Sequence, residues 1–392
     1  MLVIEHKEDC CGCSACEAVC PGQCITMTRD GEGFLYPFVE KEKCVGCGLC
    51  VKVCPVRKSG KKNQSLKGYA VQNRNQEVLK ESTSGGFFTE LAEYVIKNGG
   101  VVFGAQFDKQ FSVKHGSTDD EHQLYKFRNS KYCQSDINGT FPECKKILEA
   151  GRPVCYSGTP CQIEGLQSYL GKNYDHLITV DVACRGVPSP LLYEKYVEWN
   201  GGSDRISDIK FRDKHYGYFS STMSVYKKNG DVQRHEIKTD PMLKFFFDNL
   251  CSRPSCYHCA FKTKDRVTDF TMFDCWHAGK FSPDLQKGGA TALLIRTEKG
   301  KKIFSDIKNE FLTVEADPEE LIALDGSMML RSVKENEKRA EFFQALYTYN
   351  DFSEICALFH HHSLKQKVKL RIKDLMFRTG LFERYMRNRM KG

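Results

Sequence analysis

The spacing of eight cysteines constrains this chain more than any other feature. Two runs of the form C-x2-C-x2-C-x3-C-P follow one another near the N-terminus. Thiolates at this spacing hold cubane iron–sulfur clusters, and the fourth Cys of each run normally ligates the cluster of the other run. The spacing therefore predicts two 4Fe–4S sites, formed by Cys10, Cys13, Cys16 and Cys54 and by Cys44, Cys47, Cys50 and Cys20.

Structural zinc is the alternative for these cysteines. Zinc needs only four ligands, usually two separated C-x2-C pairs, whereas eight cysteines in matched runs are typical of a two-cluster ferredoxin. The chain is therefore predicted to transfer single electrons. Secreted disulfide scaffolds are short and lack cluster runs, so the 20 cysteines indicate a reducing cytoplasm, that of an anaerobe because exposed clusters tolerate oxygen poorly.

With 392 residues the chain predicts two or three domains. Residues 1–56 form the predicted ferredoxin domain, 57–67 a polar linker, 68–325 the main domain and 326–392 a helical C-terminal region. No apolar run reaches the ~18 residues that a membrane span needs, and residues 1–9 lack the apolar stretch of a signal peptide. The expected fold class is α+β or α/β, with a small ferredoxin-like domain before a mixed α/β domain.

Alternating strands and helices are predicted from residue 68 onward, beginning with a strand at 69–71 and a turn followed by a helix at 82–100. An Asn-Gly turn at residues 229–230 indicates a β-meander over 205–238. The further expected strands are 101–107, 153–156, 177–182 and 291–296, and the further expected helices are 141–149, one beginning at 159, 190–199 and 301–307.

A second set of cysteines stands in contexts suited to ligation. Cys161 follows Thr159-Pro160, which is typical of a capped helix start, where N–H groups stabilise a thiolate. Cys184 follows a predicted strand, and Cys256 and Cys259 form a single C-x2-C. From spacing alone, a third 4Fe–4S cluster and a structural zinc site that includes Cys251 are about equally supported. The remaining cysteines are expected to be small buried hydrophobic residues: Cys11, Cys24, Cys133, Cys144, Cys155, Cys251, Cys275 and Cys356.

Six segments of the chain, taken in order, resemble one known family. They are ESTSGGFFTELAEYVI, NSKYCQSD, YSGTPCQIEGL, VDVACRGVPSP, RPSCYHCAFK and TDFTMFDCW. Together they are similar to the beta subunit of coenzyme F420-reducing hydrogenase and its relatives, which include F420H2 and formate dehydrogenase beta subunits. The resemblance covers roughly residues 68 to 300, with a ferredoxin module in front. It departs at Cys133, Cys275 and His277, where other residue types are usual.

The resemblance implies FAD beside a 4Fe–4S cluster, and it matches Cys161, Cys184, Cys256 and Cys259 to that cluster's ligands. It further implies a flavin-binding role for Lys131, as a cation near the flavin N1–C2=O edge, where positive charge stabilises the anionic hydroquinone. A Ser/Gly turn before a helix also offers donors to a pyrophosphate or flavin, although a plain helix start explains it too. The other candidate flavin-binding residues are Ser82, Thr83, Ser84, Gly85, Gly86, Ser135, Gly158, Thr159 and Pro160.

These features predict a flavin-dependent iron–sulfur oxidoreductase. It would pass electrons between a hydride carrier resembling F420 and a ferredoxin-like partner. One alternative keeps the flavin but uses a nicotinamide or a cell-envelope sugar intermediate, although no G-x-G-x-x-G supports nicotinamide binding. The other is an electron-transfer adaptor with no substrate of its own.

The formal net charge of +8 comes from the last thirty residues, which hold ten basic and two acidic side chains. Apolar residues at helical spacing indicate a basic amphipathic helix there. Contact with the inner face of the membrane, docking on the protein itself or on a partner, and a solvated tail are the alternatives. Nucleic-acid binding is not expected, because no recognition module accompanies the charge.

Overall fold

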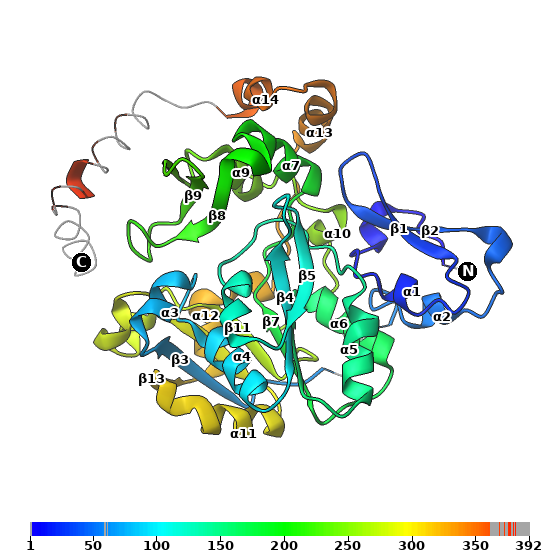
Figure 1. Ribbon diagram of the computed structural model, residues 1–392, viewed down its shortest axis with the longest axis horizontal. Coiled ribbons are helices and arrows are strands. Elements are labelled where there is room, and N and C mark those ends of the chain that lie inside the picture. Colours follow the sequence, from blue (N-terminus) through cyan, green and yellow to red (C-terminus); the bar gives the residue numbers. More distant parts are fainter. Residues whose placement is uncertain are drawn as a thin grey trace.

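The computed structural model describes residues 2–58, 60, 62–360, 368, 372, 375–377, 379 and 381. A small N-terminal module lies beside a large mixed α/β domain, and a meander with several helices covers one end of that domain (Figure 1). This arrangement confirms the predicted fold class. No helix within the described ranges has the length and apolarity to cross a bilayer.

The N-terminal module is built on one antiparallel strand pair, β1 (Ile25–Arg29) with β2 (Leu35–Val39). Asp30 closes the turn between them by accepting hydrogen bonds from the backbone N–H of Glu32 and Phe34. Each cysteine run contributes a 3-10 helix and a one-turn α-helix: η1 (Lys7–Asp9), α1 (Ala15–Ala18), η2 (Lys41–Lys43) and α2 (Leu49–Lys52).

An eight-stranded mixed sheet organises the main domain. Its strand order is β13-β3-β12-β11-β7-β6-β4-β5. The four strands β4, β6, β7 and β11 are parallel to their neighbours within this group, and the outer pairings are antiparallel. The strands are β3 (Lys67–Asn73), β4 (Val101–Phe107), β5 (Val113–Thr118), β6 (Val154–Gly158), β7 (Leu177–Val182), β11 (Phe270–Asp274), β12 (Thr291–Ile295) and β13 (Phe311–Ala316).

Helices cover both faces of this sheet because successive strand side chains point to opposite sides. Val101 and Phe103 of β4 pack with α5 and α6, whereas Val102 packs with α4 on the other face. The covering helices are α3 (Gln76–Glu81), α4 (Phe87–Lys97), α5 (Thr140–Glu149), α6 (Pro160–Leu170), α11 (Glu298–Ile307) and α12 (Pro318–Asp325). The 3-10 helices are η3 (Glu121–Phe127), η4 (Ala278–Lys280), η5 (Pro283–Gln286), η6 (Lys308–Glu310) and η7 (Ser327–Met329).

The predicted meander forms the second sheet and is inserted between β7 and β11. Its antiparallel strands are β8 (Ile206–Asp213), β9 (Thr222–Lys227) and β10 (Val232–Glu236), with the Asn229–Gly230 turn between β9 and β10. It shares an apolar core with part of the surrounding helices. These helices are α7 (Pro190–Trp199), α8 (Gly202–Arg205), α9 (Pro241–Phe247), α10 (Pro254–Tyr257), α13 (Arg339–Thr348) and α14 (Phe352–Phe359).

Three strands of the main sheet were not expected from the sequence: β5, β11 and β13. In β11, Phe270 and Thr271 are both fully buried although they point to opposite faces. A central strand that is covered on both sides lacks the period-2 alternation by which strands are recognised.

The basic helix predicted over residues 363–392 falls almost entirely outside the described residues. Within them, the Phe377 ring lies 4.6 Å from the ring of His215 and 5.0 Å from that of Tyr216, both just after β8. This contact places Phe377 beside the meander. The predicted membrane contact stays a prediction.

Candidate functional site

The two cysteine runs fold into two cavities, each lined by cysteines from both runs. The first cavity is lined by Cys10, Cys13, Cys16 and Cys54. The second is lined by Cys20, Cys44, Cys47 and Cys50. Both sets are the ligand sets predicted from the spacing, including the exchange of the fourth Cys.

The turns that shape these cavities need backbone conformations that glycine adopts readily. Gly12 and Gly46 each stand immediately before the second ligand of their run, and both have φ of +71°. Only a residue without Cβ takes this left-handed conformation at no steric cost. The two runs therefore have the same backbone conformation before their second ligand.

Cys161, Cys184, Cys256 and Cys259 line a third cavity in the main domain. They come from three separate segments: the first turn of α6, the loop after β7, and α10 with the residues that follow it. Within the described part of the chain, no three His, Cys, Asp or Glu side chains group closely enough to hold a single metal ion. Four thiols around one cavity are the donor set of a cubane cluster, which they would ligate through its iron atoms.

Local structure explains why Cys161 faces this cavity. Thr159 and Gln162 form the predicted capping box at the start of α6, with Pro160 at the first helical position. The Thr159 hydroxyl lies 3.2 Å from the Cys161 thiol. Free N–H groups in the first turn favour negative charge there, so the position suits a thiolate ligand.

Burial favours the neutral thiol form of this third set. Desolvation raises the pKa of Cys184 to about 12 and also raises the pKa of Cys256. A bound metal reverses this balance, because its positive charge deprotonates a coordinating thiol. The Lys262 ammonium contacts the backbone carbonyls of Cys184 and Met328 and adds positive charge beside the cavity.

The first and third cavities are neighbours. Cys11 and Val56 line both of them. A methyl group on Gly165, in the second turn of α6, would lie 2.8 Å from the Cys13 Cβ, so the helix that carries Cys161 packs directly on a ligand of the first cavity. Cys16 of the first cavity packs in one cluster with Cys20 and Cys50 of the second, so the first cavity adjoins both of the others.

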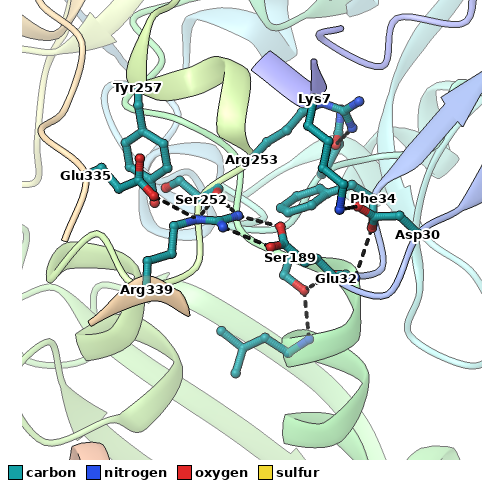
Figure 2. A network of polar contacts seen from close by, with 12 residues as sticks. Lys7, Asp30, Glu32, Phe34, Ser189, Ser252, Arg253, Tyr257, Glu335 and Arg339 are labelled. Carbon is teal, nitrogen blue, oxygen red and sulfur yellow. Dashed lines mark hydrogen bonds and ion pairs between the residues drawn. The ribbon is translucent and has the colours of Figure 1, made fainter. Parts of the chain in front are cut away.

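Two buried arginines attach the N-terminal module to the main domain (Figure 2). Arg253 donates to the carbonyl oxygen of Cys10 at 2.7 Å and to that of Leu35 at 2.9 Å. Arg339 binds both carboxylate oxygens of Glu32 and also donates to the carbonyl of Ser252. Neither arginine was predicted from the sequence. Arg253 stands two residues before the Ser255-Cys256 ligand segment, and that proximity is the only signal that could have pointed to it.

The candidate flavin residues fall into two groups at the carboxyl edge of the parallel strands. In the first group, the turn 82–86 meets the segment 129–132, because the Thr83 hydroxyl accepts a hydrogen bond of 2.9 Å from the N–H of Ser130. Other polar groups of this turn are bound within the protein: Ser84 donates to the Ala290 carbonyl at 2.6 Å, and the N–H of Gly85 donates to the Thr291 hydroxyl at 2.9 Å.

The second group lies around β6 and the start of α6. The amide of Gln162 donates to the Ser135 hydroxyl at 2.9 Å, and Ser135 is also 3.0 Å from Nδ1 of His115. Gln162 accepts from the N–H of Thr159, which follows Gly158 at the end of β6. The structure thus brings Ser135, Gly158, Thr159 and Pro160 to one place, through a histidine that sequence patterns gave no reason to select.

Cationic side chains without full anionic partners collect between these groups. Lys131 is desolvated, which lowers its pKa to about 8, and its ammonium donates to the carbonyls of Arg128 and Asn129. Arg212 pairs with Asp274 at 3.0 Å and lies over the Trp276 ring, and its Nη2 is buried with no hydrogen-bond partner among the described residues. An anionic cofactor such as FAD would satisfy these donors, so the residues present fit the group.

The three departures from the family pattern have ordinary surroundings. Cys133 and Cys275 are buried, as expected for small hydrophobic residues. His277 is half exposed and its Nδ1 lies 2.8 Å from Asp325, so it is a surface residue with a carboxylate partner.

Comparison with known proteins gives two family matches and a distant structural one. Residues 151–320 match the family model for the C-terminal part of the coenzyme F420 hydrogenase/dehydrogenase beta subunit, and residues 9–58 match the 4Fe-4S dicluster domain. No curated protein matches the chain. A chain of the F420-reducing nickel–iron hydrogenase complex from Methanosarcina barkeri is similar at 18% identity and TM-score 0.47, over 68% of this chain and 89% of that one. The chain thus carries a 4Fe–4S dicluster domain followed by a region that matches the C-terminal part of the coenzyme F420 hydrogenase/dehydrogenase beta subunit.

Proposed function

We propose that this protein is an iron–sulfur flavoprotein oxidoreductase with three 4Fe–4S clusters and FAD. It exchanges a hydride with a carrier of the deazaflavin type and passes single electrons to or from a ferredoxin-like partner. The observation that carries the proposal is the series of three adjoining cavities, each lined by the four cysteines of one predicted ligand set, with the third at the edge of the main sheet. FAD would supply the conversion between electron pairs and single electrons.

The residues of the main domain have defined parts in this scheme. Lys131 and Arg212 would hold the anionic parts of the cofactor, because the desolvated Lys131 ammonium donates to backbone carbonyls and the buried Arg212 Nη2 has no hydrogen-bond partner among the described residues. The segment 129–132 would place Lys131 against the flavin, since Asn129 accepts from the backbone N–H of Arg212 and Ser130 donates to Thr83. The turn 82–86 would form the wall of the site.

The second cavity is the proposed exit to the partner. Cys47 is exposed there, and Val45 beside it is 75% exposed. An exposed apolar residue next to a cluster lets a partner exclude water at the contact and approach the iron closely. The partner that fits this port is a small one-electron carrier.

Iron content tests the third cluster. Anaerobically purified protein is expected to hold about 12 iron atoms per chain, four for each cubane. The change Cys161→Ser should lower this number to about 8. Cys155→Ser is the matched control, because Cys155 is fully buried in the main domain away from the cavities and should leave the content unchanged. Equal iron in the Cys161 variant and the native protein would contradict a third cluster.

Flavin content tests the enzyme. The protein should release FAD on anaerobic extraction, and its flavin band should bleach with a productive donor among reduced F420, NADH, NADPH and reduced ferredoxin. Lys131→Met should weaken FAD binding and make the flavin harder to reduce, because a cation near the N1–C2=O edge is lost. Retention of FAD with an unchanged potential in this variant would contradict the assigned place of Lys131.

One observation favours the adaptor as a second candidate. The Ser84 hydroxyl and the Gly85 N–H already have partners within the protein, so these two donors of the turn are not free for a flavin. Protein with intact clusters that contains no flavin, and takes none up on reconstitution, would favour an adaptor that carries electrons only.

A further inference from the structure

Arg253 occupies the junction between the first and third cavities. Its backbone frames the third cavity: Arg253 caps α10, its carbonyl accepts from the N–H of Cys256 at 2.9 Å, and its N–H donates to Val187, which lines that cavity. Its side chain reaches the first cavity, where Nε donates to the carbonyl of Cys10. One residue therefore touches a cysteine of each site.

The guanidinium is enclosed. Its residue is 0% exposed, and the group lies 4.2 Å from the centre of the Tyr36 ring and 5.4 Å from that of Phe34. Its third donor group reaches the Gln134 side-chain oxygen at 2.9 Å. A methyl group on Gly12 would come within 2.8 Å of both Arg253 and Gln134, which shows how tightly the first cysteine run surrounds this charge.

Nothing within the described residues neutralises Arg253 with a carboxylate, since none approaches its guanidinium within 4.0 Å. A buried charge without a counter-charge is strongly destabilising. The groups that can carry negative charge and act on Arg253 include the thiols of Cys10, Cys11 and Cys256 and the Tyr36 hydroxyl. Four thiolates around a 4Fe–4S core leave a net negative charge, which grows when the cluster accepts an electron.

We propose that the Arg253 guanidinium is the shared counter-charge of the first and third clusters and raises their reduction potentials relative to the second cluster. The inference rests on the proposed third cluster. A fixed positive charge in a medium of low polarity stabilises the reduced form of each adjacent cluster more than the oxidised form. Electrons are thereby held near the main domain, beside the flavin, until a partner docks at the second cluster.

Arg339 supplies the matched control. It is also a buried arginine that attaches the N-terminal module, but its charge is neutralised by Glu32 through a two-point contact. Its other acceptor is the Ser252 carbonyl, not that of a cluster cysteine. Removing Arg339 and the Glu32 charge together should therefore loosen the module without altering cluster potentials.

The test is an anaerobic redox titration of the full-length protein followed by EPR, with iron and sulfide measured first. Arg253→Met should shift the midpoint potentials of the first and third clusters to more negative values, and Arg253→Lys, which keeps the charge, should shift them less. Arg339→Met combined with Glu32→Gln, which removes this ion pair without leaving a lone charge, should leave all potentials at native values. Equal shifts in the Met and Lys variants of Arg253, or unchanged potentials in Arg253→Met, would overturn the proposal.

Gln134→Glu keeps the proposal testable if Arg253→Met does not fold. This nearly isosteric change retains Arg253 and puts a carboxylate against its guanidinium, so the same potentials should again become more negative. Full iron content with native potentials in this variant would contradict the role of Arg253. Iron for only two clusters in the native protein would instead contradict the third cluster, which separates the two failures.

Discussion

The two cysteine runs have the same backbone and different surroundings. In each, a 3-10 helix precedes the first ligand and a one-turn helix follows a residue in the left-handed region, Ser14 with φ of +59° or Gly48 with φ of +73°. Around the first run, however, Cys13 is buried against the main domain, whereas Cys47, the corresponding residue of the second run, is exposed.

This difference shows that the cysteine spacing and the docking of the module decide separate properties. The spacing decides which thiols meet and how the loops turn, and it does so equally in both runs. Docking then gives one cluster a buried cation and a neighbouring cavity, and leaves the other at the surface. Two sequence repeats with the same ligands thereby form two different cluster sites. We call the buried first site, with the residues that dock it, the inner half of the module, and the exposed second site the outer half.

Removing the carboxylate that fixes the inner half should have the largest effect. Glu32→Ala leaves the buried Arg339 guanidinium without its counter-charge, and breaking such a pair costs about 3 to 5 kcal/mol. Glu40→Ala in the outer half removes an exposed pair with Lys43, worth at most about 1 kcal/mol. Anaerobic thermal unfolding of the cluster-loaded protein should therefore show a much larger drop for Glu32→Ala. Equal drops would mean that docking does not distinguish the halves.

Paired glycine changes sharpen the comparison further. Gly12→Ala and Gly46→Ala should each cost about 1 to 2 kcal/mol, because both residues have φ of +71°. The change Gly12→Ala should destabilise the protein by a further ~1 to 3 kcal/mol through overpacking, because its new methyl group would lie 2.8 Å from Arg253 and Gln134. A methyl group on Gly46 would have nothing within 4 Å, so Gly46→Ala lacks this additional cost. The same unfolding measurement checks this; a larger cost at Gly46 would contradict the described docking.

The sequence predicts the parts of this site that are encoded by neighbouring residues. The ligands of the first two cavities lie within short runs, and the capped start of α6 is written in Thr159, Pro160 and Gln162. For the third set, spacing alone left zinc and iron–sulfur equally supported, and the family resemblance decided between them.

Contacts between distant segments could not be predicted. Arg253 and Cys10 are 243 positions apart, and Arg339 and Glu32 are 307 apart, so no local pattern connects them. Cys11 shows a second limit. It is buried, as expected for a small hydrophobic residue, and sequence could not show that it lies between two cavities. The flavin residues were brought to two places rather than one, and their role stays a prediction.

The smallest expected effect concerns pH and the support of the inner half. His115 is buried, with Nε2 donating to the Ser157 carbonyl at 3.1 Å and Nδ1 accepting from the Ser135 hydroxyl. The residue before Ser135 is Gln134, whose side-chain amide donates to the Cys11 carbonyl beside the first cavity. Burial lowers the pKa of His115 to about 4. In the unfolded chain a histidine titrates near 6.5, so the unfolded state takes up the proton first.

The contribution of His115 to stability should therefore be constant above about pH 7.5 and fall as the pH is lowered from about 6.5 toward 4, by about 1 kcal/mol at pH 5.5. Other groups and the acid lability of the clusters contribute as well, so the measurement is the difference between the native protein and His115→Gln at pH 7.5 and 5.5. The variant should lose less stability than the native protein over this range. Equal losses of stability in the native protein and in His115→Gln would show that protonation of His115 does not destabilise the residues that support the first cluster.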